Sequence, residues 1–287
     1  MPSTLDKYRF RLAKIPALGK FCDRAEELVR AENPETLWSV EPAFQELLSS
    51  DFIESFVLSE LNNIADNQFY YLEGSSEFQA AVVESAGYSL TLKFMPPELQ
   101  MSAPLASLTE NVLMSAWRES AQVEVYKLEQ PFRIDVFDRS KRLLHVGTKD
   151  LLPGSVARFR APGETFRLVS QRPAVMLQLL SANVAPLRWI FDTQTLEPIR
   201  AAAARLISSR LQFTCHTLAA LGSPTSITAL KKLMIHPEHF VRWAAIQSIC
   251  MISREDGIEC LHQALEDDHP HIRNAAQKTL TKYGKEA

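Results

Sequence analysis

The strongest candidates for a chemical role in this 287-residue chain are its histidines, because six of the seven lie in the last third. Four of the six stand where helices are expected to begin: His236, His239, His269 and His271. Imidazole nitrogens bind transition metals, so these four form a candidate metal cluster. Histidines next to proline at a helix start more commonly act as solvent-exposed caps, and we favour that interpretation. We therefore predict no metal and no cofactor, although the sequence leaves metal binding by these histidines open.

The sequence gives little support for a catalytic nucleophile or for a phosphate-binding loop. The four cysteines, Cys22, Cys215, Cys250 and Cys260, form no CxxC pair, and no glycine elbow accompanies any of them. Since no export signal is recognised, we interpret them as reduced, mostly buried thiols of a cytoplasmic protein. His145 is too isolated to form a site by itself. The glycine patterns GxGxxG and GxxxxGK[ST] are absent, which excludes phosphate-binding loops of those types.

A basic stripe near the end of the chain has two interpretations. Lys231, Lys232, Arg242 and Arg273 could bind nucleic acid if they shared one face. Acidic residues are interleaved with them: Glu255, Asp256, Glu259, Glu266, Asp267 and Asp268. We favour a structural ladder, in which Arg242 and Arg273 do equivalent jobs by bonding to carboxylates or helix-end carbonyls of a neighbouring unit. We therefore do not expect a nucleic-acid partner.

The composition is that of an ordinary soluble protein. Apolar residues make up 46% of the chain and charged residues 23%, and the formal net charge is −3. No apolar run reaches the roughly 18 residues that a membrane span needs, so we predict no membrane association. The length suggests more than one domain.

The spacing of apolar residues changes twice along the chain. Residues 1–66 show helical spacing, and from about residue 67 the period is two, with short segments separated by turn residues. We predict strands over 69–72, 78–83, 88–94, 122–128, 132–137, 142–146, 155–159, 165–169 and 174–180. From about residue 195 the helical period returns, and its first stripe runs from Ile199 to Ile207. Such short strands favour an antiparallel barrel or jelly roll between two helical regions.

The last region repeats itself at an offset of 31 residues. Val241, Arg242 and Ala245, for example, are followed at that offset by Ile272, Arg273 and Ala276. A period near 30 with helical spacing predicts a solenoid of paired helices. Segments 236–245 and 269–276 resemble short HEAT repeats, in which a proline opens a helix and a Val/Ile-Arg pair follows. The resemblance covers about 195–287 and implies a surface that binds proteins.

Segment 150–166 resembles the second sequence motif of the cupin family. Gly154, Pro162 and Gly163 match that motif, but Phe166 stands where the family carries a metal-binding histidine. Segments 88–97 and 103–108 together resemble the first motif in its cysteine-dioxygenase-like form, with Ala106 and Leu108 at the two histidine positions. The resemblance covers about 67–185. It implies a cupin-like barrel whose usual iron site is lost, because a metal needs N, O or S donors.

These observations predict an α+β protein with three parts. They are a helical N-terminal segment (1–66), a cupin-like antiparallel β-barrel (67–190) and a HEAT-like α-solenoid (191–287). We expect a non-enzymatic interaction or regulatory scaffold whose solenoid binds a protein partner. Ala106, Leu108 and Phe166 would make the barrel pocket apolar, so a small apolar ligand is expected there. The alternative is a cupin-type, metal-dependent oxygenase with ligands at positions that the motifs do not mark.

Overall fold

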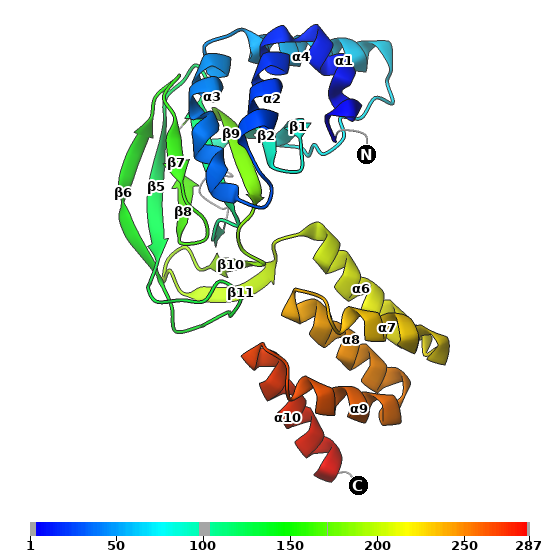
Figure 1. Ribbon diagram of the computed structural model, residues 1–287. Helices are drawn as coiled ribbons and strands as arrows, with labels where there is room; N and C mark the ends of the chain where they lie inside the picture. Colours follow the sequence, from blue (N-terminus) through cyan, green and yellow to red (C-terminus); the bar gives the residue numbers. More distant parts are fainter. Residues whose placement is uncertain (1–3, 98–103, 171, 286–287) are drawn as a thin grey trace. The chain divides into compact units, whose positions relative to one another are not determined.

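The computed structural model describes residues 4–97, 104–170 and 172–285 (Figure 1). It shows helices first, then strands, then helices again, which confirms the order predicted from the sequence. The chain divides into two compact units, Met1–Ala202 and Ala203–Ala287, called here the strand unit and the repeat unit. In the described ranges, no helix has both the length and the apolar character that crossing a membrane requires.

The strand unit begins with helices whose first residues are set by prolines. Pro16, Pro34 and Pro42 each stand at the first or second position of a helix, where a missing N–H costs nothing. The elements are the 3-10 helix Thr4–Tyr8, α1 (Arg9–Lys14), α2 (Pro16–Leu28), the 3-10 helix Pro34–Val40, α3 (Glu41–Leu48) and α4 (Phe52–Asp66).

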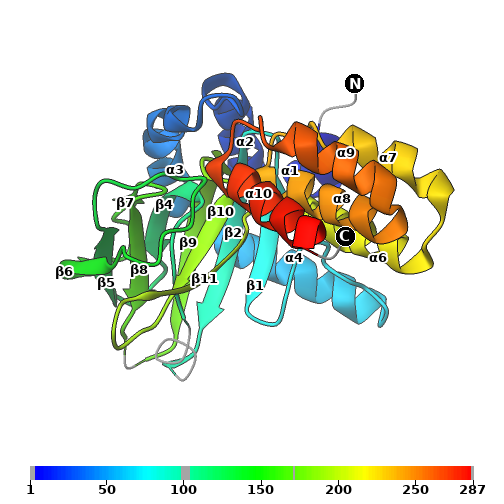
Figure 2. The ribbon, with the colours of Figure 1, turned by 90° about the horizontal axis from the view of Figure 1, so that it is seen from below.

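Three antiparallel sheets follow. The largest has the order β1 (Gln79–Glu84), β2 (Tyr88–Met95), β9 (Ala174–Asn183), β4 (Glu110–Ala116), β7 (Ala157–Phe159). The second has the order β6 (Leu143–Leu151), β5 (Ala121–Leu128), β8 (Glu164–Leu168), and these strands lie side by side in Figure 2. The third has the order β11 (Pro198–Ala203), β10 (Leu187–Phe191), β3 (Leu105–Ala106).

The five-stranded sheet is buried on both faces. Along β9, Leu177 and Leu179 pack into a core shared with the N-terminal helices, whereas Met176 packs into a second core shared with β5 and β8. Figure 1 shows α2 and α3 lying across this sheet. The result is one layer of helices and two facing sheets, with the sheets forming the flattened barrel of a jelly roll.

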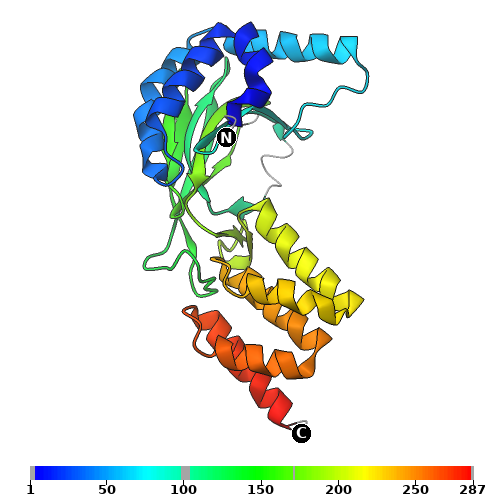
Figure 3. The same cartoon turned by 45° about the vertical axis from the view of Figure 1, so that its right-hand side comes forward.

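The repeat unit is a stack of antiparallel helices, seen in order from yellow to red in Figure 3. Its helices are α6 (Leu206–Leu221), the 3-10 turn Pro224–Ser226, α7 (Ile227–Leu233), α8 (His239–Ile252), α9 (Arg254–Ala264) and α10 (Pro270–Lys285). α8 packs against α6, α7 and α9, and α9 packs against α10. The alanines of the 31-residue repeat, Ala244, Ala245 and Ala276, are buried where these helices approach each other.

Several local predictions were wrong. The stripe from Ile199 to Ile207 is not a helix, because residues 198–203 form β11, and α6 starts only at Leu206. Pairing of β11 with β10 overrides the helix propensity of its alanines. Residues 69–72 and 132–137 are turns and loops instead of strands. The strands β3, β4 and β10 were not predicted.

Candidate functional site

A small pocket lies beside the core between the two facing sheets. Its volume is about 130 Å³, close to that of the roughly 150 Å³ apolar cavity that holds benzene in an engineered protein. Its lining residues are Lys93, Met95, Pro104, Leu105, Met114, Phe166, Arg167, Leu168, Met176 and Gln178. The walls are therefore mostly apolar, with three methionines, and the pocket suits a ligand of about six heavy atoms.

The structure brings only one of the three residues predicted for this pocket into its lining. Phe166 lines the pocket and packs on Phe159, with ring centroids 4.5 Å apart. Leu108 packs against the same core, but it lies outside the lining. Ala106 also lies outside it, and its carbonyl accepts a hydrogen bond from the hydroxyl of Thr165. From β3 it is the neighbouring Leu105 that reaches the pocket.

Three polar side chains of the pocket escaped the sequence analysis: Lys93, Arg167 and Gln178. Burial lowers the pKa of the Lys93 amine, and the nearby positive charge of Arg188 lowers it further. Gln178 is buried on β9, and its Nε2 lies 3.1 Å from the sulfur of Met114. In the sequence, Lys93 stands at a polar position of an alternating strand, after Ser89 and Thr91, so the pattern alone does not identify this wall of the pocket.

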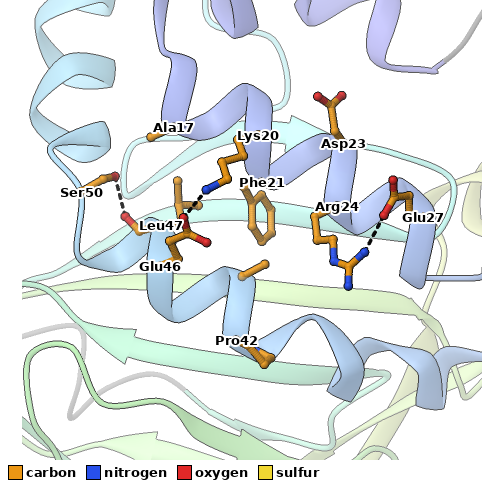
Figure 4. A pocket seen from close by; sticks show the side chains of 11 residues that line it. Ala17, Lys20, Phe21, Asp23, Arg24, Glu27, Pro42, Glu46, Leu47 and Ser50 are labelled. Carbon is orange, nitrogen blue, oxygen red and sulfur yellow. Dashed lines mark hydrogen bonds and ion pairs between the residues drawn. The ribbon is translucent and has the colours of Figure 1, made fainter.

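A larger hollow lies between α2 and α3, with a volume of about 490 Å³ (Figure 4). Phe21 and Leu47, which line it, belong to the core below. The charged groups around it pair with each other: Lys20 Nζ donates to Glu46, and Arg24 Nη1 lies 2.7 Å from Glu27 Oε2. This hollow is therefore a largely ion-paired surface over the helical core.

Arg242 is the most heavily bonded side chain of the repeat unit. It is 8% exposed and holds Asp267 with two hydrogen bonds, from Nε at 2.9 Å and from Nη2 at 2.7 Å. Its Nη2 also lies 2.7 Å from Asp268, and its Nη1 donates to the carbonyls of His236 and Pro237. Arg242 therefore ties the loop before α8 to the loop before α10.

The electrostatics of Asp267 fit this role. Burial by itself would raise the pKa of this carboxyl group. The hydrogen bonds from Arg242 and from the backbone N–H of His269 outweigh that effect, and the net result is a lowered pKa. Asp267 is therefore ionised throughout the neutral range, and the ion pair with Arg242 stays formed.

Arg273 shares only part of this arrangement. Its Nη1 donates to the carbonyl of Asp267 at 2.6 Å, six residues before it, just as Arg242 donates to the carbonyl of His236. Arg273 is exposed, and within the described residues it forms no ion pair. Lys231 pairs with Asp256 at 2.8 Å, so the proposed basic stripe is largely compensated by carboxylates.

Three of the four helix-start histidines meet. His239 begins α8, His269 precedes α10 and His271 lies in the first turn of α10. Each offers one ligand atom, and these atoms lie within 4.8 Å of one another. His269 is only 4% exposed, so the prediction of solvent-exposed caps is wrong for this residue. The fourth histidine, His236, stays outside the group, and its Nδ1 accepts a hydrogen bond from the N–H of Glu238.

The cysteines offer no activated nucleophile. Burial raises the pKa of the Cys22 thiol to about 12, so it carries almost no thiolate at neutral pH. Burial also raises the pKa values of Cys215, Cys250 and Cys260. His145 is exposed on β6 and stacks edge-on against Tyr126.

Comparisons with known proteins recognise the end of the repeat unit by its sequence. A family model described as HEAT repeats matches residues 237–287. No curated protein matches the chain in sequence.

Several solved structures are similar to 38% of this chain. A hydroquinone 1,2-dioxygenase in complex with Cd²⁺ and 4-hydroxybenzonitrile is 18% identical, is covered over 68% of its length and has a TM-score of 0.27. A hydroquinone 1,2-dioxygenase from a Sphingomonas species is 16% identical, is likewise covered over 68% and has a TM-score of 0.28. A cupin superfamily protein from Desulfitobacterium hafniense is 14% identical, is covered over 82% and has a TM-score of 0.23. Similarity at this level says nothing about the activity of this chain.

Proposed function

We propose that this protein is a non-enzymatic interaction or regulatory scaffold. Its repeat unit binds a protein partner, and the pocket of its strand unit binds a small, mainly apolar ligand. HEAT repeats generally mediate protein interactions, and the matched segment covers α8, α9 and α10.

The observation that carries the proposal is an apolar face on α6. Leu206, Phe213 and Leu221 are 66%, 73% and 71% exposed, and each is about two helical turns from the next. The opposite side of the helix, with Cys215 and Ala219, is buried against the repeat core. Single exposed apolar side chains are normal, but three aligned on one helix are typical of an interaction surface.

Affinity capture from the source cells tests this proposal. The wild-type chain is compared with Phe213→Glu and Leu221→Glu, which place a charge on the α6 face. Leu58→Glu is the matched control, since Leu58 is 61% exposed on α4 of the other unit. We expect one protein to be enriched by the wild type and the control and lost by both α6 variants. Equal capture by all four chains would contradict binding at α6.

The ligand proposal is supported by the apolar lining and the small volume of the pocket. A benzene-sized compound should raise the melting temperature of the wild-type chain by mass action. Met176→Phe, which fills the pocket, should abolish this rise. Met251→Phe is the control, because Met251 is 68% exposed on α8. If a panel of such compounds stabilises none of the chains, or stabilises the filled variant equally, the pocket has no ligand of this class.

The alternative, a metal-dependent oxygenase, needs a ligand set in the strand unit. Over the described part of that unit, no three side chains of His, Cys, Asp or Glu gather with metal-binding spacing. Stoichiometric iron in an untagged chain that carries both His239→Ala and His271→Ala would favour this alternative over the scaffold.

A further inference from the structure

The histidine group of the repeat unit has the composition of a transition-metal site. We propose that His239, His269 and His271 bind one divalent ion of the zinc class, linking the start of α8 to the start of α10. The proposal rests on the meeting of three imidazoles from two successive repeats, with ligand atoms within 4.8 Å of one another.

The three rings must reorient to bind an ion. Zinc–nitrogen bonds of 2.0–2.1 Å in a tetrahedral site place ligand nitrogens about 3.3 Å apart. The rings of His239 and His269 are stacked, with centroids 3.6 Å apart and planes at 4°, and His271 is nearly perpendicular to both. The stacked pair must therefore splay so that both lone pairs point at the ion. His239 is half-buried and His271 is exposed, whereas His269 is buried, so the reorientation falls mainly to the first two.

The backbone around the group is held in place. Asp267 Oδ1 accepts a hydrogen bond of 2.8 Å from the N–H of His269, while the same carboxylate is bound by Arg242. Arg242 also bonds to the carbonyls of His236 and Pro237, just before His239. One buried guanidinium thus fixes the loops that carry the three imidazoles, which lowers the entropy lost on metal binding.

Binding an ion costs at least one hydrogen bond of the group, and nearby negative charge offsets this cost. The N–H of His271 donates to Nδ1 of His269 at 3.3 Å, a long hydrogen bond that is lost whichever nitrogen of His269 binds the ion. Two helix N-termini disfavour a cation, but Arg242, Asp267 and Asp268 together carry a net negative charge. Glu238 adds a buried carboxylate oxygen that accepts no hydrogen bond from the described residues, so a cation held by the adjacent His239 would offset its burial.

The donor set selects the class of ion. Neutral imidazole nitrogens suit Zn²⁺, Ni²⁺, Cu²⁺ and Fe²⁺, whereas Ca²⁺ and Mg²⁺ require oxygen ligands. Asp267, two residues before His269, is committed to Arg242. Three nitrogen ligands leave a fourth position for water or for a side chain of a partner.

Titration of the full, untagged chain with Zn²⁺ or Co²⁺ tests the site. We expect one ion per chain, a tetrahedral Co²⁺ absorption spectrum and a higher melting temperature with Zn²⁺. His239→Ala and His271→Ala should each weaken binding by more than about tenfold and abolish the tetrahedral spectrum. His216→Ala and His262→Ala are matched controls, because both residues are exposed histidines of the same unit outside the group.

These measurements distinguish a specific metal site from nonspecific binding by surface histidines. No binding by the wild type would overturn the proposal. So would equal losses in the controls, or unchanged binding by the His239 and His271 variants. His271 is exposed, so its replacement leaves the fold intact, and the urea midpoint of His271→Ala without metal should equal that of the wild type.

Discussion

Two parts of the repeat unit each contain an arginine and a glycine, but these residues lie in different environments. At the junction between α8 and α10, Arg242 is buried and bonded to carboxylates, and Gly257 allows α9 to lie against Cys250 of α8. On α10, the last helix, Arg273 and Gly284 are exposed. The sequence repeat assigns Arg242 and Arg273 the same position. Their environments differ because a residue at a repeat junction acquires its role only when the next repeat packs against it.

The largest expected effect concerns the other end of the array, where α6 exposes apolar side chains. We expect residues 203–287 expressed alone to be poorly soluble and to melt without a cooperative transition, because short arrays need polar caps. Phe213→Glu should raise the solubility of this fragment. Circular dichroism melting and sedimentation measure both effects. A sharp transition near the melting temperature of the full chain would show that the five helices suffice by themselves.

The two arginines give the next largest difference. Arg242→Met should lower the free energy of unfolding by about 3 kcal/mol, because it leaves Asp267 buried without its partner. Asp268 contributes little to this loss, since its side chain is 89% exposed. Arg273→Met should cost no more than about 0.5 kcal/mol, as expected for an exposed residue with one carbonyl bond. Urea unfolding of the three chains measures both values, and equal losses would restore the equivalence predicted from the repeat.

The two glycines should respond to alanine with opposite signs. A Cβ at Gly257 would lie 2.6 Å from Cα of Cys250, which is backbone and cannot move aside, so Gly257→Ala should cost about 2 kcal/mol. A Cβ at Gly284 meets no described atom within 4 Å, so Gly284→Ala should stabilise α10 by up to about 1 kcal/mol. Thermal unfolding of both variants gives the signs directly. Destabilisation by both would mean that α10 also has a close neighbour.

Whether an element packs against sequence neighbours or against distant strands decides how much of it could be predicted from the sequence. The repeat at 31 residues located α7 to α10, because packing in an array is local and recurs with the period. β4 was missed because six of its seven residues are buried, which removes the alternation that marks a half-buried strand. β11 was taken for a helix because its three alanines favour one until β10 pairs with them.

The histidine group shows how far a candidate site can be predicted from the sequence. The sequence names the four candidates, but nothing in it says that the loops before α8 and α10 lie together and that His236 stays outside. That selection depends on how two repeats stack and on the bonds of Arg242. Lys93 was missed for a related reason, because its burial in a pocket wall depends on strands distant in sequence.

The smallest effect is the pH dependence of the two arginine variants. The pKa of Asp267 is lower in the folded chain than its unfolded value of about 3.9, so its pairing with Arg242 stabilises the fold fully above that value. The stabilisation is lost as the pH falls through the folded pKa. The difference in unfolding free energy between wild type and Arg242→Met should therefore shrink in acid. The difference for Arg273→Met should stay constant, because Arg273 bonds to a carbonyl that does not titrate. Urea unfolding at neutral and acidic pH measures both, and parallel pH profiles would place a carboxylate at Arg273 as well.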